Sequence, residues 1–448
     1  MRSAYPLAIA AAILVLAPAT AGAKERHELQ YTQLISRALD GGTPNGPSTN
    51  AVISQDRRWS RYVAFESEAS NLVRNDANGF KDVFVVRRDG SFHNNGSKWQ
   101  RGKTTLISRS PSGPANGPSW GAAVDGSFWT VPSCVAFLSS ASNLVPGDTN
   151  GRVDAFVSRR IGKLPRRVSL PGGAQSTEDT TEVAVSGDCS RIAFVTGGKL
   201  YVQAGKKVRR VKVGAPAGDP SFSNGFTNDL AFTGPKGVYI SRGGTKRPKL
   251  MGPGGRNPAY SDIHKPPPNC KRRTLAYERK QRGRWQIVQR VQGDKTRVIS
   301  RRRKSHGNGD SRHPVIGNAG CYVTFESDAT NLGLNATGRK GDHNSAPDVY
   351  LYTGVRRITL VQSVRHKAIP LQAGGRAPSM SWYANYVVFH SAAPLKNQFR
   401  MEPWQFRSLG RPIGPAQYED PVPPPQPQPG PAPPPDTSQV YMRYLGPV

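Results

Sequence analysis

Acidic residues are scarce in this sequence. Asp and Glu together number 30 among 448 residues, against 62 Lys and Arg, which gives a formal net charge of +32 at pH 7. With so few carboxylates, no pair suited to glycosidic acid–base chemistry can be identified. A surface of this charge attracts polyanions such as acidic envelope polymers, anionic lipid or nucleic acid.

Long apolar runs are also missing, apart from one near the N-terminus. Arg2 precedes an apolar stretch over residues 7–16, and a small-x-small triplet ends at Ala23. This layout is typical of a secretory signal peptide, and the run is too short for a membrane span. We therefore expect a signal peptide over residues 1–23, cleavage before Lys24, no membrane span, and a secreted or periplasmic location.

Cysteine is rare, but the count is even. The four cysteines are Cys134, Cys189, Cys270 and Cys321. Their spacings match no zinc pattern and include no CxxC. In an exported chain an even number of cysteines favours disulfides.

Helical periodicity is almost absent, and a short strand pattern recurs instead. Seven segments alternate apolar and polar residues and end on an aromatic side chain, as half-buried strands do. These segments are 61–67 (RYVAFES), 133–139, 191–196, 228–234, 273–279, 321–327 and 385–391. Second and third strand patterns follow, for example at 82–88 and 104–109, and a short inner strand precedes each segment. Four short strands repeated in this way predict a β-propeller.

The seventh repeat lacks its later strands, but matching sequences stand near the two ends of the chain. QVYMRYLG (439–446) resembles a second strand, and TQLISR (32–37) nearly repeats TTLISR (104–109). The N-terminal strand would then complete the last blade and close the ring, which removes an unpaired strand edge. The Pro-rich segment 421–435 becomes an extended loop inserted in that blade. The sequence predicts an all-β propeller over residues 31–446 with seven four-stranded blades, or six if one weak central repeat is not a blade.

Two repeats carry a family resemblance. VAFESEASNLVRNDANGFKDVFVVRR (63–88) and VAFLSSASNLVPGDTNGRVDAFVSRR (135–160) resemble the repeats of TolB-like β-propeller proteins, which are exported bacterial chains. The resemblance is strongest over residues 48–170 and 310–361. It implies a periplasmic or secreted interaction scaffold rather than a catalyst. The family is typically six-bladed, and the seven repeats counted here depart from that number.

A polar loop with the pattern D-x-N-x-x-x-D recurs three times between the first and second of these strands. Calcium takes six to eight oxygen ligands, and Asp and Asn side chains can supply some of them. The full EF-hand pattern is absent, and Asp and Asn also bond their own backbone in turns. A turn and a calcium site both remain open at these nine residues: Asp76, Asn78, Asp82, Asp148, Asn150, Asp154, Asp342, Asn344 and Asp348.

Two other patterns resemble sites of chemistry. GPSWG (117–121) matches the G-x-S-x-G nucleophile elbow around Ser119, but no helical period follows, as that motif requires. SHGNGDSRH brings together His306, Asp310 and His313, and its spacing fits no known metal-ligand pattern. We expect no catalytic residue and no cofactor other than a possible calcium ion.

The cysteines all fall in the turn that leads into the aromatic-ended strand. Strands alternate in direction within a blade, so these turns share one face of the ring and the D-x-N-x-x-x-D loops share the other. Cys134 and Cys189 lie in consecutive repeats, as do Cys270 and Cys321. We predict these two pairings over the two other connectivities, and each bond would brace neighbouring blades.

Basic clusters at 206–210, 279–284 and 301–304 account for part of the charge. They form either a solvated basic rim or a binding surface for an anion. No recognition helix or regularly spaced aromatic series accompanies them, so specific nucleic-acid recognition is not expected. The sequence favours a non-catalytic exported scaffold, monomeric, that binds a protein or an anionic envelope polymer. The alternative is a hydrolase or lyase acting at the central channel.

Overall fold

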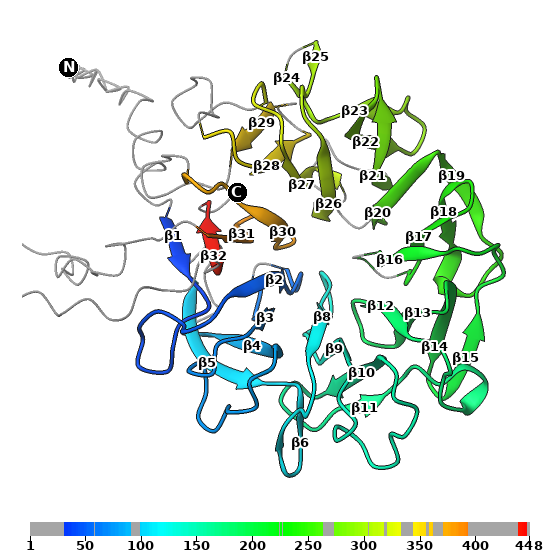
Figure 1. Cartoon of the computed structure of the whole chain (residues 1–448). Helices are drawn as coiled ribbons and strands as arrows, with labels where there is room; N and C mark the ends of the chain where they lie inside the picture. The colour runs from blue at the N-terminus through cyan, green and yellow to red at the C-terminus, as the bar shows by residue number, and fades with distance from the viewer. Residues whose placement is uncertain are drawn as a thin grey trace, which may run out of the picture.

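The computed structural model shows a closed ring of seven four-stranded antiparallel sheets (Figure 1). It describes residues 31–392 and 438–445, apart from residues 58, 91–98, 224, 226, 263–272, 303, 318–319, 333–343, 355–357 and 362–370. The expected signal peptide, the Pro-rich segment 421–435 and Cys270 lie outside these residues. The chain is an all-β propeller, as predicted, and it has seven blades rather than six.

The blades follow one another along the chain, each with its first strand nearest the centre (Figure 1). The first three are β2 (Ser48–Ile53), β3 (Tyr62–Ser67), β4 (Asp82–Asp89) and β5 (Gln100–Leu106); β8 (Ser119–Val124), β9 (Cys134–Ser139), β10 (Asp154–Arg159) and β11 (Arg166–Arg167); and β12 (Thr180–Val185), β13 (Arg191–Thr196), β14 (Lys199–Ala204) and β15 (Lys207–Arg210). The next three are β16 (Gly218–Phe222), β17 (Leu230–Gly234), β18 (Gly237–Ser241) and β19 (Lys249–Pro253); β20 (Gly255–Ser261), β21 (Thr274–Gln281), β22 (Arg284–Val291) and β23 (Arg297–Val298); and β26 (Ser311–Gly317), β27 (Tyr322–Ser327), β28 (Asp348–Thr353) and β29 (Ile358–Val361). The seventh is β30 (Arg376–Met380), β31 (Tyr386–Ser391), β32 (Gln439–Tyr444) and β1 (Tyr31–Leu34).

Short elements occupy some of the connections. Two small hairpins lie in the links between blades: β6 (Arg109–Ser110) with β7 (Gly113–Pro114), and β24 (Arg301–Arg302) with β25 (Ser305–His306). In the described part, helix is limited to two 3-10 turns, η1 (Pro171–Gly173) and η2 (Arg242–Gly244). No helix within that part has the length and apolar character needed to cross a membrane.

The seventh blade is assembled from both ends of the chain, as the sequence predicted. β1 pairs antiparallel with β32, with Tyr31 opposite Tyr444 and Leu34 opposite Tyr441. The buried Ser36 Oγ donates to Gln439 Oε1 at 2.8 Å and fixes the chain just beyond β1. Because every blade then has a neighbour on each side, no first or last blade exposes an unfinished packing surface.

The aromatic residue that ends the repeated strand signature has a definite partner. In six blades it lies directly opposite an aromatic residue of the third strand, with ring centroids 5.4–6.1 Å apart. The pairs are Phe65–Phe84, Phe137–Phe156, Phe194–Tyr201, Phe232–Tyr239, Phe325–Tyr350 and Phe389–Tyr441. Paired rings at this distance add to the energy of burial and hold the register of the strands.

The hydrophobic core is divided among the junctions between blades. The junction between the seventh and first blades, for example, buries Val388 and Met442 against Val63, Phe65 and Phe84. Both faces of a blade are therefore apolar along its two middle strands, which explains why those strands are the most recognisable part of each repeat.

The antiparallel order gives the ring two distinct faces. The loop face carries the connections between the second and third strands and the links between blades, such as residues 68–81, 140–153 and 282–283. The hairpin face carries the other two turns of each blade, such as residues 54–61, 125–133 and 205–206. Within the described residues, the first two D-x-N-x-x-x-D loops lie on the loop face and the turns that carry Cys134, Cys189 and Cys321 on the hairpin face, as expected.

Candidate functional site

The first D-x-N-x-x-x-D loop is held by its asparagine. Asn78 Oδ1 accepts the backbone N–H of Phe80 at 3.0 Å, and Asn78 Nδ2 donates to Asp82 Oδ2 at 2.5 Å and to the carbonyl of Ala115 at 3.0 Å. Asp82 Oδ1 accepts the hydroxyl of Ser108 at 2.5 Å. The asparagine amide thus closes the turn and ties it to the link that leads to the next blade. Its oxygen accepts a backbone N–H within the turn.

The second loop repeats these contacts and adds a cation of its own. Asn150 Oδ1 accepts the N–H of Arg152 at 3.2 Å, and Asn150 Nδ2 donates to Asp154 Oδ2 at 3.0 Å. Arg167 Nη1 lies 3.0 Å from both Asp148 Oδ1 and Asp154 Oδ2. A buried guanidinium group therefore stands between the two carboxylates of this loop.

The third loop is described only in part. Asn344 Oδ1 accepts the N–H of Ala346 at 3.0 Å, and Asn344 Nδ2 donates to the carbonyl of Leu371 at 2.5 Å. Asp348 is fully buried at the start of β28. Asp342 lies outside the described residues. All three asparagines therefore brace turns, and calcium binding at these loops stays a prediction.

Polar side chains, mostly carboxylates, also join neighbouring blades, and no pattern in the sequence predicts these bonds. In each case a residue at a bulge of an inner strand has a positive φ, and its backbone N–H donates to a side chain of the preceding blade. Gly121 (φ +65°) donates to Glu66 Oε1 at 2.8 Å, and His313 (φ +52°) donates to Glu278 Oε1 at 2.9 Å. The same bond joins Asn50 to His390, Asp219 to Glu182, Asn257 to Asp219 and Ala377 to Glu326.

Among these junction acids Glu66, Glu278 and Glu326 are buried, whereas Glu182 and Asp219 are half-buried, and their environments differ. Burial raises the pKa of Glu66, and burial followed by the charge of Asp219 raises the pKa of Glu182 to about 7. Burial alone would also raise the pKa of Glu326, but the imidazole of His313, with Nδ1 3.1 Å from Glu326 Oε1, lowers it below its usual value. The acids occupy five of the seven junctions, and each accepts a backbone N–H.

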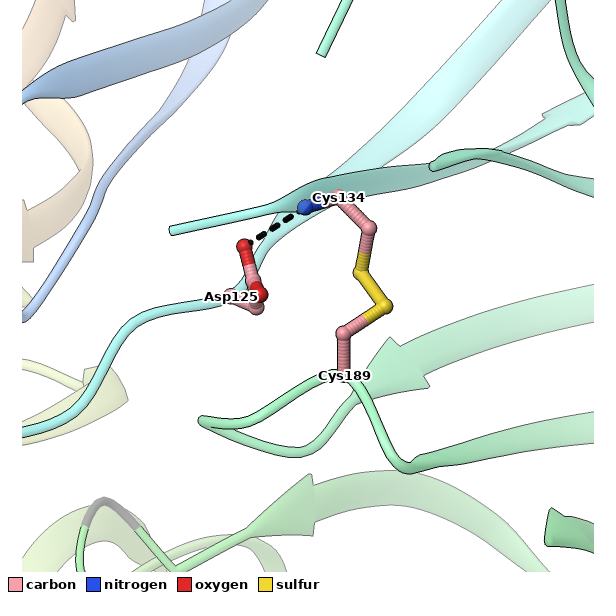
Figure 2. Close-up of side chains that lie close together, drawn as sticks. All are labelled: Asp125, Cys134 and Cys189. Atoms are coloured by element: carbon pink, nitrogen blue, oxygen red, sulfur yellow. Dashed lines mark hydrogen bonds between the residues drawn. A yellow bond between two sulfur atoms is a disulfide. The ribbon is translucent and has the colours of Figure 1, made fainter. Parts of the chain in front are cut away.

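The junction between the second and third blades has a covalent brace. Cys134, at the start of β9, forms a disulfide with Cys189, in the turn before β13, with the Cα atoms 6.2 Å apart (Figure 2). Within the described residues this is the junction that shows no bond of the kind just described. Cys321 is disulfide-bonded as well, while Cys270, its expected partner, lies outside the described residues.

Asp125 lies beside this disulfide. Its Oδ1 accepts the N–H of Cys134 at 2.9 Å (Figure 2). The same oxygen accepts the N–H of Ser133 at 2.7 Å, and Oδ2 accepts the Ser133 hydroxyl at 2.9 Å. Asp125, Cys134 and Cys189 make up the one cluster of three potential metal-ligating side chains among the described residues. Both sulfur atoms are in the disulfide and provide no thiolate, so the aspartate closes a turn rather than a metal site.

The other candidate residues do not come together. Ser119 is fully buried, and its Oγ donates to Ser139 Oγ at 2.9 Å, which is a strand-to-strand bond. His306 lies in the small β24–β25 hairpin, whereas His313 lies on the inner strand of the next blade and contacts Glu326. Asp310 accepts the backbone N–H of Trp285 at 2.9 Å. Each of these residues therefore has a separate local role.

Two basic segments that are apart in the sequence meet on the loop face. Arg282 lies in the turn between β21 and β22, Arg284 begins β22, and Arg301 and Lys304 belong to the β24–β25 hairpin; all four side chains are exposed. Burial, and then the charges of Arg282 and Arg301, lower the pKa of His306. Gln286 Nε2, just beyond Arg284 on β22, donates to the carbonyl of Gly307, the residue after His306, at 3.3 Å, so the two segments lie side by side. We call Arg282, Arg284, Arg301 and Lys304 the basic loop-face patch.

Arg282 occupies an unusual backbone position. It forms the two-residue turn of a hairpin with Gly283, at φ +51° and +82°, and Gln281 pairs with Arg284 on either side. Such turns favour Asn-Gly, because a side chain with a Cβ is strained at positive φ. The sequence thus places a guanidinium at the exposed tip of this hairpin at a cost in backbone energy.

The hairpin face carries a different surface, also missed in the sequence. The guanidinium of Arg57 stacks on Phe128 and Trp129, with its Cζ 4.7 and 4.3 Å from the ring centroids, and its Nε donates to the Phe128 carbonyl at 2.7 Å. Trp129 is 43% exposed. The third basic cluster, residues 206–210, begins on this face at the turn between β14 and β15 and continues along the outer strand β15.

Comparisons with known proteins give structural likeness and little more. No protein-family model matches this chain, and no curated protein matches it either. Similar solved structures include a putative TolB from Agrobacterium tumefaciens (15% identity, TM-score 0.34, 51% of this chain and 73% of that one) and a prolyl endopeptidase (10%, 0.41, 76% and 51%). Dipeptidyl peptidase 4 of Porphyromonas gingivalis is another (13%, 0.36, 76% and 50%). This chain spans about half the length of the two peptidases, and at these TM-scores the likeness carries no argument about activity.

Proposed function

We propose that this chain is a non-catalytic exported scaffold that binds an anionic polymer through the basic loop-face patch. The observation behind the proposal is that two basic segments lie side by side on the loop face, where Gln286 Nε2 donates to the Gly307 carbonyl at 3.3 Å. Like charges gathered on one surface repel one another in the free protein, and a polyanion relieves that repulsion when it binds. The net charge of +32 provides long-range attraction for the same class of partner.

Other features support a scaffold in an oxidising compartment. The buried junction acids accept backbone N–H groups from the next blade, which suits a rigid ring. The Cys134–Cys189 disulfide is of the kind that persists outside the cytosol. The expected signal peptide at residues 1–23 agrees with export.

Binding to a sulfated polymer tests the proposal. Fluorescence anisotropy would compare labelled dextran sulfate with neutral dextran of the same length, using the full chain at several salt concentrations. We expect binding to dextran sulfate alone, weakening steeply between about 50 and 500 mM salt as counterions screen the charges. Equal binding to the two polymers, or binding to dextran sulfate that salt does not change, would contradict the proposal.

A further inference from the structure

The first and second D-x-N-x-x-x-D loops place two carboxylates in equivalent positions. In each loop the last Asp begins the third strand of its blade, and the asparagine four residues earlier binds that carboxylate through Nδ2. Asp76 therefore corresponds to Asp148, and Asp82 to Asp154. In the second loop both carboxylates reach the same Arg167 Nη1, so these positions converge on one point.

The loops differ in what stands at that point. Arg167 pairs with Phe156 across β10 and β11, and the residue that pairs with the equivalent Phe84 across β4 and β5 is Leu106. A leucine side chain offers no charge and no hydrogen-bond donor. The guanidinium that neutralises the second loop is thus missing from the first.

The two loops also differ at a second position, where the second loop has Gln175. In the second loop its Oε1 accepts from Arg167 Nη1 at 2.8 Å, and its Nε2 donates to the carbonyl of Gly147 at 2.8 Å. Ser176 and Ala115 are equivalent because their carbonyls accept from the two loop asparagines, so Pro114 takes the place of Gln175 in the first loop. A proline side chain cannot donate or accept a hydrogen bond.

Two buried acids of the first loop therefore have no ion-pair partner among the described residues. Asp76 is 7% exposed, and no hydrogen bond or ion pair to its carboxylate exists among the described residues. Asp82 is fully buried. Burial, with the charge of Asp76 as a smaller contribution, raises the pKa of Asp82 to about 7 against the hydrogen bonds from Ser108 and Asn78. A buried carboxylate without a partner is costly unless a cation joins it.

We propose that the first loop binds a calcium ion between Asp76 and Asp82, at the position that Arg167 fills in the second loop. The available donors are all oxygen, which suits a hard cation, and calcium accepts irregular sites that water completes. The carbonyl of Asn75 is a further ligand, because the equivalent Gly147 carbonyl faces Arg167 Nη2 at 3.4 Å. The second loop carries its own cation and takes no metal.

Reciprocal exchange of the two residues tests this assignment. Isothermal titration calorimetry with calcium chloride would measure the number of ions bound by the full chain and by three variants. Asp76→Asn should remove one site relative to the unaltered chain. Leu106→Arg should also remove one site, because it supplies the guanidinium of the second loop. Arg167→Leu should add one site.

Thermal unfolding in calcium or in EDTA provides a readout that separates binding from folding. The unaltered chain should melt at a higher temperature in calcium, whereas Leu106→Arg should melt at one temperature in both and no lower than the unaltered chain in EDTA. The proposal is overturned if Asp76→Asn binds as many ions as the unaltered chain. It is equally overturned if the unaltered chain binds none at millimolar calcium, since a proton on Asp82 would then be the cation.

Discussion

Ending the chain before β32 should abolish cooperative unfolding of the propeller. β32 lies between β31 and β1, so its loss leaves β1 without a partner and breaks the seventh blade. A ring that lacks one blade exposes the apolar sides of both neighbours. A truncated chain that stops at Asp436 should therefore show no sharp thermal transition by circular dichroism.

The expected size of this effect follows from burial. All six residues of β32 are at most 4% exposed, and four of them, Val440, Tyr441, Met442 and Tyr444, are large and apolar. Burying such side chains contributes about 2–3 kcal/mol each, and therefore about 8–12 kcal/mol together. Domains have free energies of unfolding of about 5–15 kcal/mol, so the burial of this strand contributes most of the stability of a typical domain.

Two further chains make this prediction specific. A chain that stops at Leu445 keeps β32 and should melt as the full chain does. Met442→Ala leaves the strand in place and should cost about 2–5 kcal/mol of unfolding free energy, because Met442 is fully buried. If the chain ending at Asp436 unfolds with the same midpoint as the full chain, β32 does not close the ring.

Removing the basic loop-face patch should weaken binding to dextran sulfate by two to three orders of magnitude. The variant combines Arg282→Asn, Arg284→Thr, Arg301→Thr and Lys304→Ser. Each charge close to an anionic surface contributes about 1 kcal/mol, so four removed charges amount to about 4 kcal/mol, a factor of roughly a thousand in the dissociation constant. The asparagine at residue 282 suits the positive φ of the turn, so the fold should not suffer.

A matched control removes the same charge from the other face. Lys206→Ser, Lys207→Thr, Arg209→Thr and Arg210→Thr alter exposed residues of the turn between β14 and β15, on the hairpin face, and of the outer strand β15. Both variants have the same net charge, so long-range attraction falls equally in the two. The control should lose less than about tenfold in affinity. Equal losses in the two variants would mean that total charge, and no particular surface, controls binding.

Much of the fold can be predicted from the sequence because each blade repeats the same physical requirement. A middle strand that is apolar on both sides ends on an aromatic residue, which packs against an aromatic residue of the neighbouring strand, as Phe65 packs against Phe84. That requirement leaves a readable pattern in every repeat. The closure of the ring is readable for the same reason, since TQLISR at 32–37 repeats the strand TTLISR.

The hydrogen bonds that join neighbouring blades, and the contacts within the D-x-N-x-x-x-D loops, cannot be predicted in the same way. A bond such as Gly121 N–H to Glu66 depends on a positive φ at a bulge and on contact between two blades 55 residues apart, neither of which follows from hydropathy. The three D-x-N-x-x-x-D loops look alike in sequence. On the next strand the first loop has Leu106 where the second loop has Arg167. Only the pairing of strands reveals this difference.

The placement of the basic clusters on the two faces cannot be predicted from the sequence alone either. In the sequence they are three separate charge runs. Strand order assigns residues 206–210 to the hairpin face and brings residues 279–284 and 301–304 together on the loop face. The binding surface is therefore a product of topology rather than of a motif.

Hydrogen–deuterium exchange of the full chain with and without dextran sulfate would show where the polymer binds. We expect slower exchange on binding in peptides that cover residues 279–286 and 299–307, which carry the basic loop-face patch. Peptides that cover residues 205–211 and the Arg57–Trp129 surface on the hairpin face should exchange at unchanged rates. Protection on the hairpin face, or none over residues 279–286 and 299–307 while the polymer is bound, would contradict it.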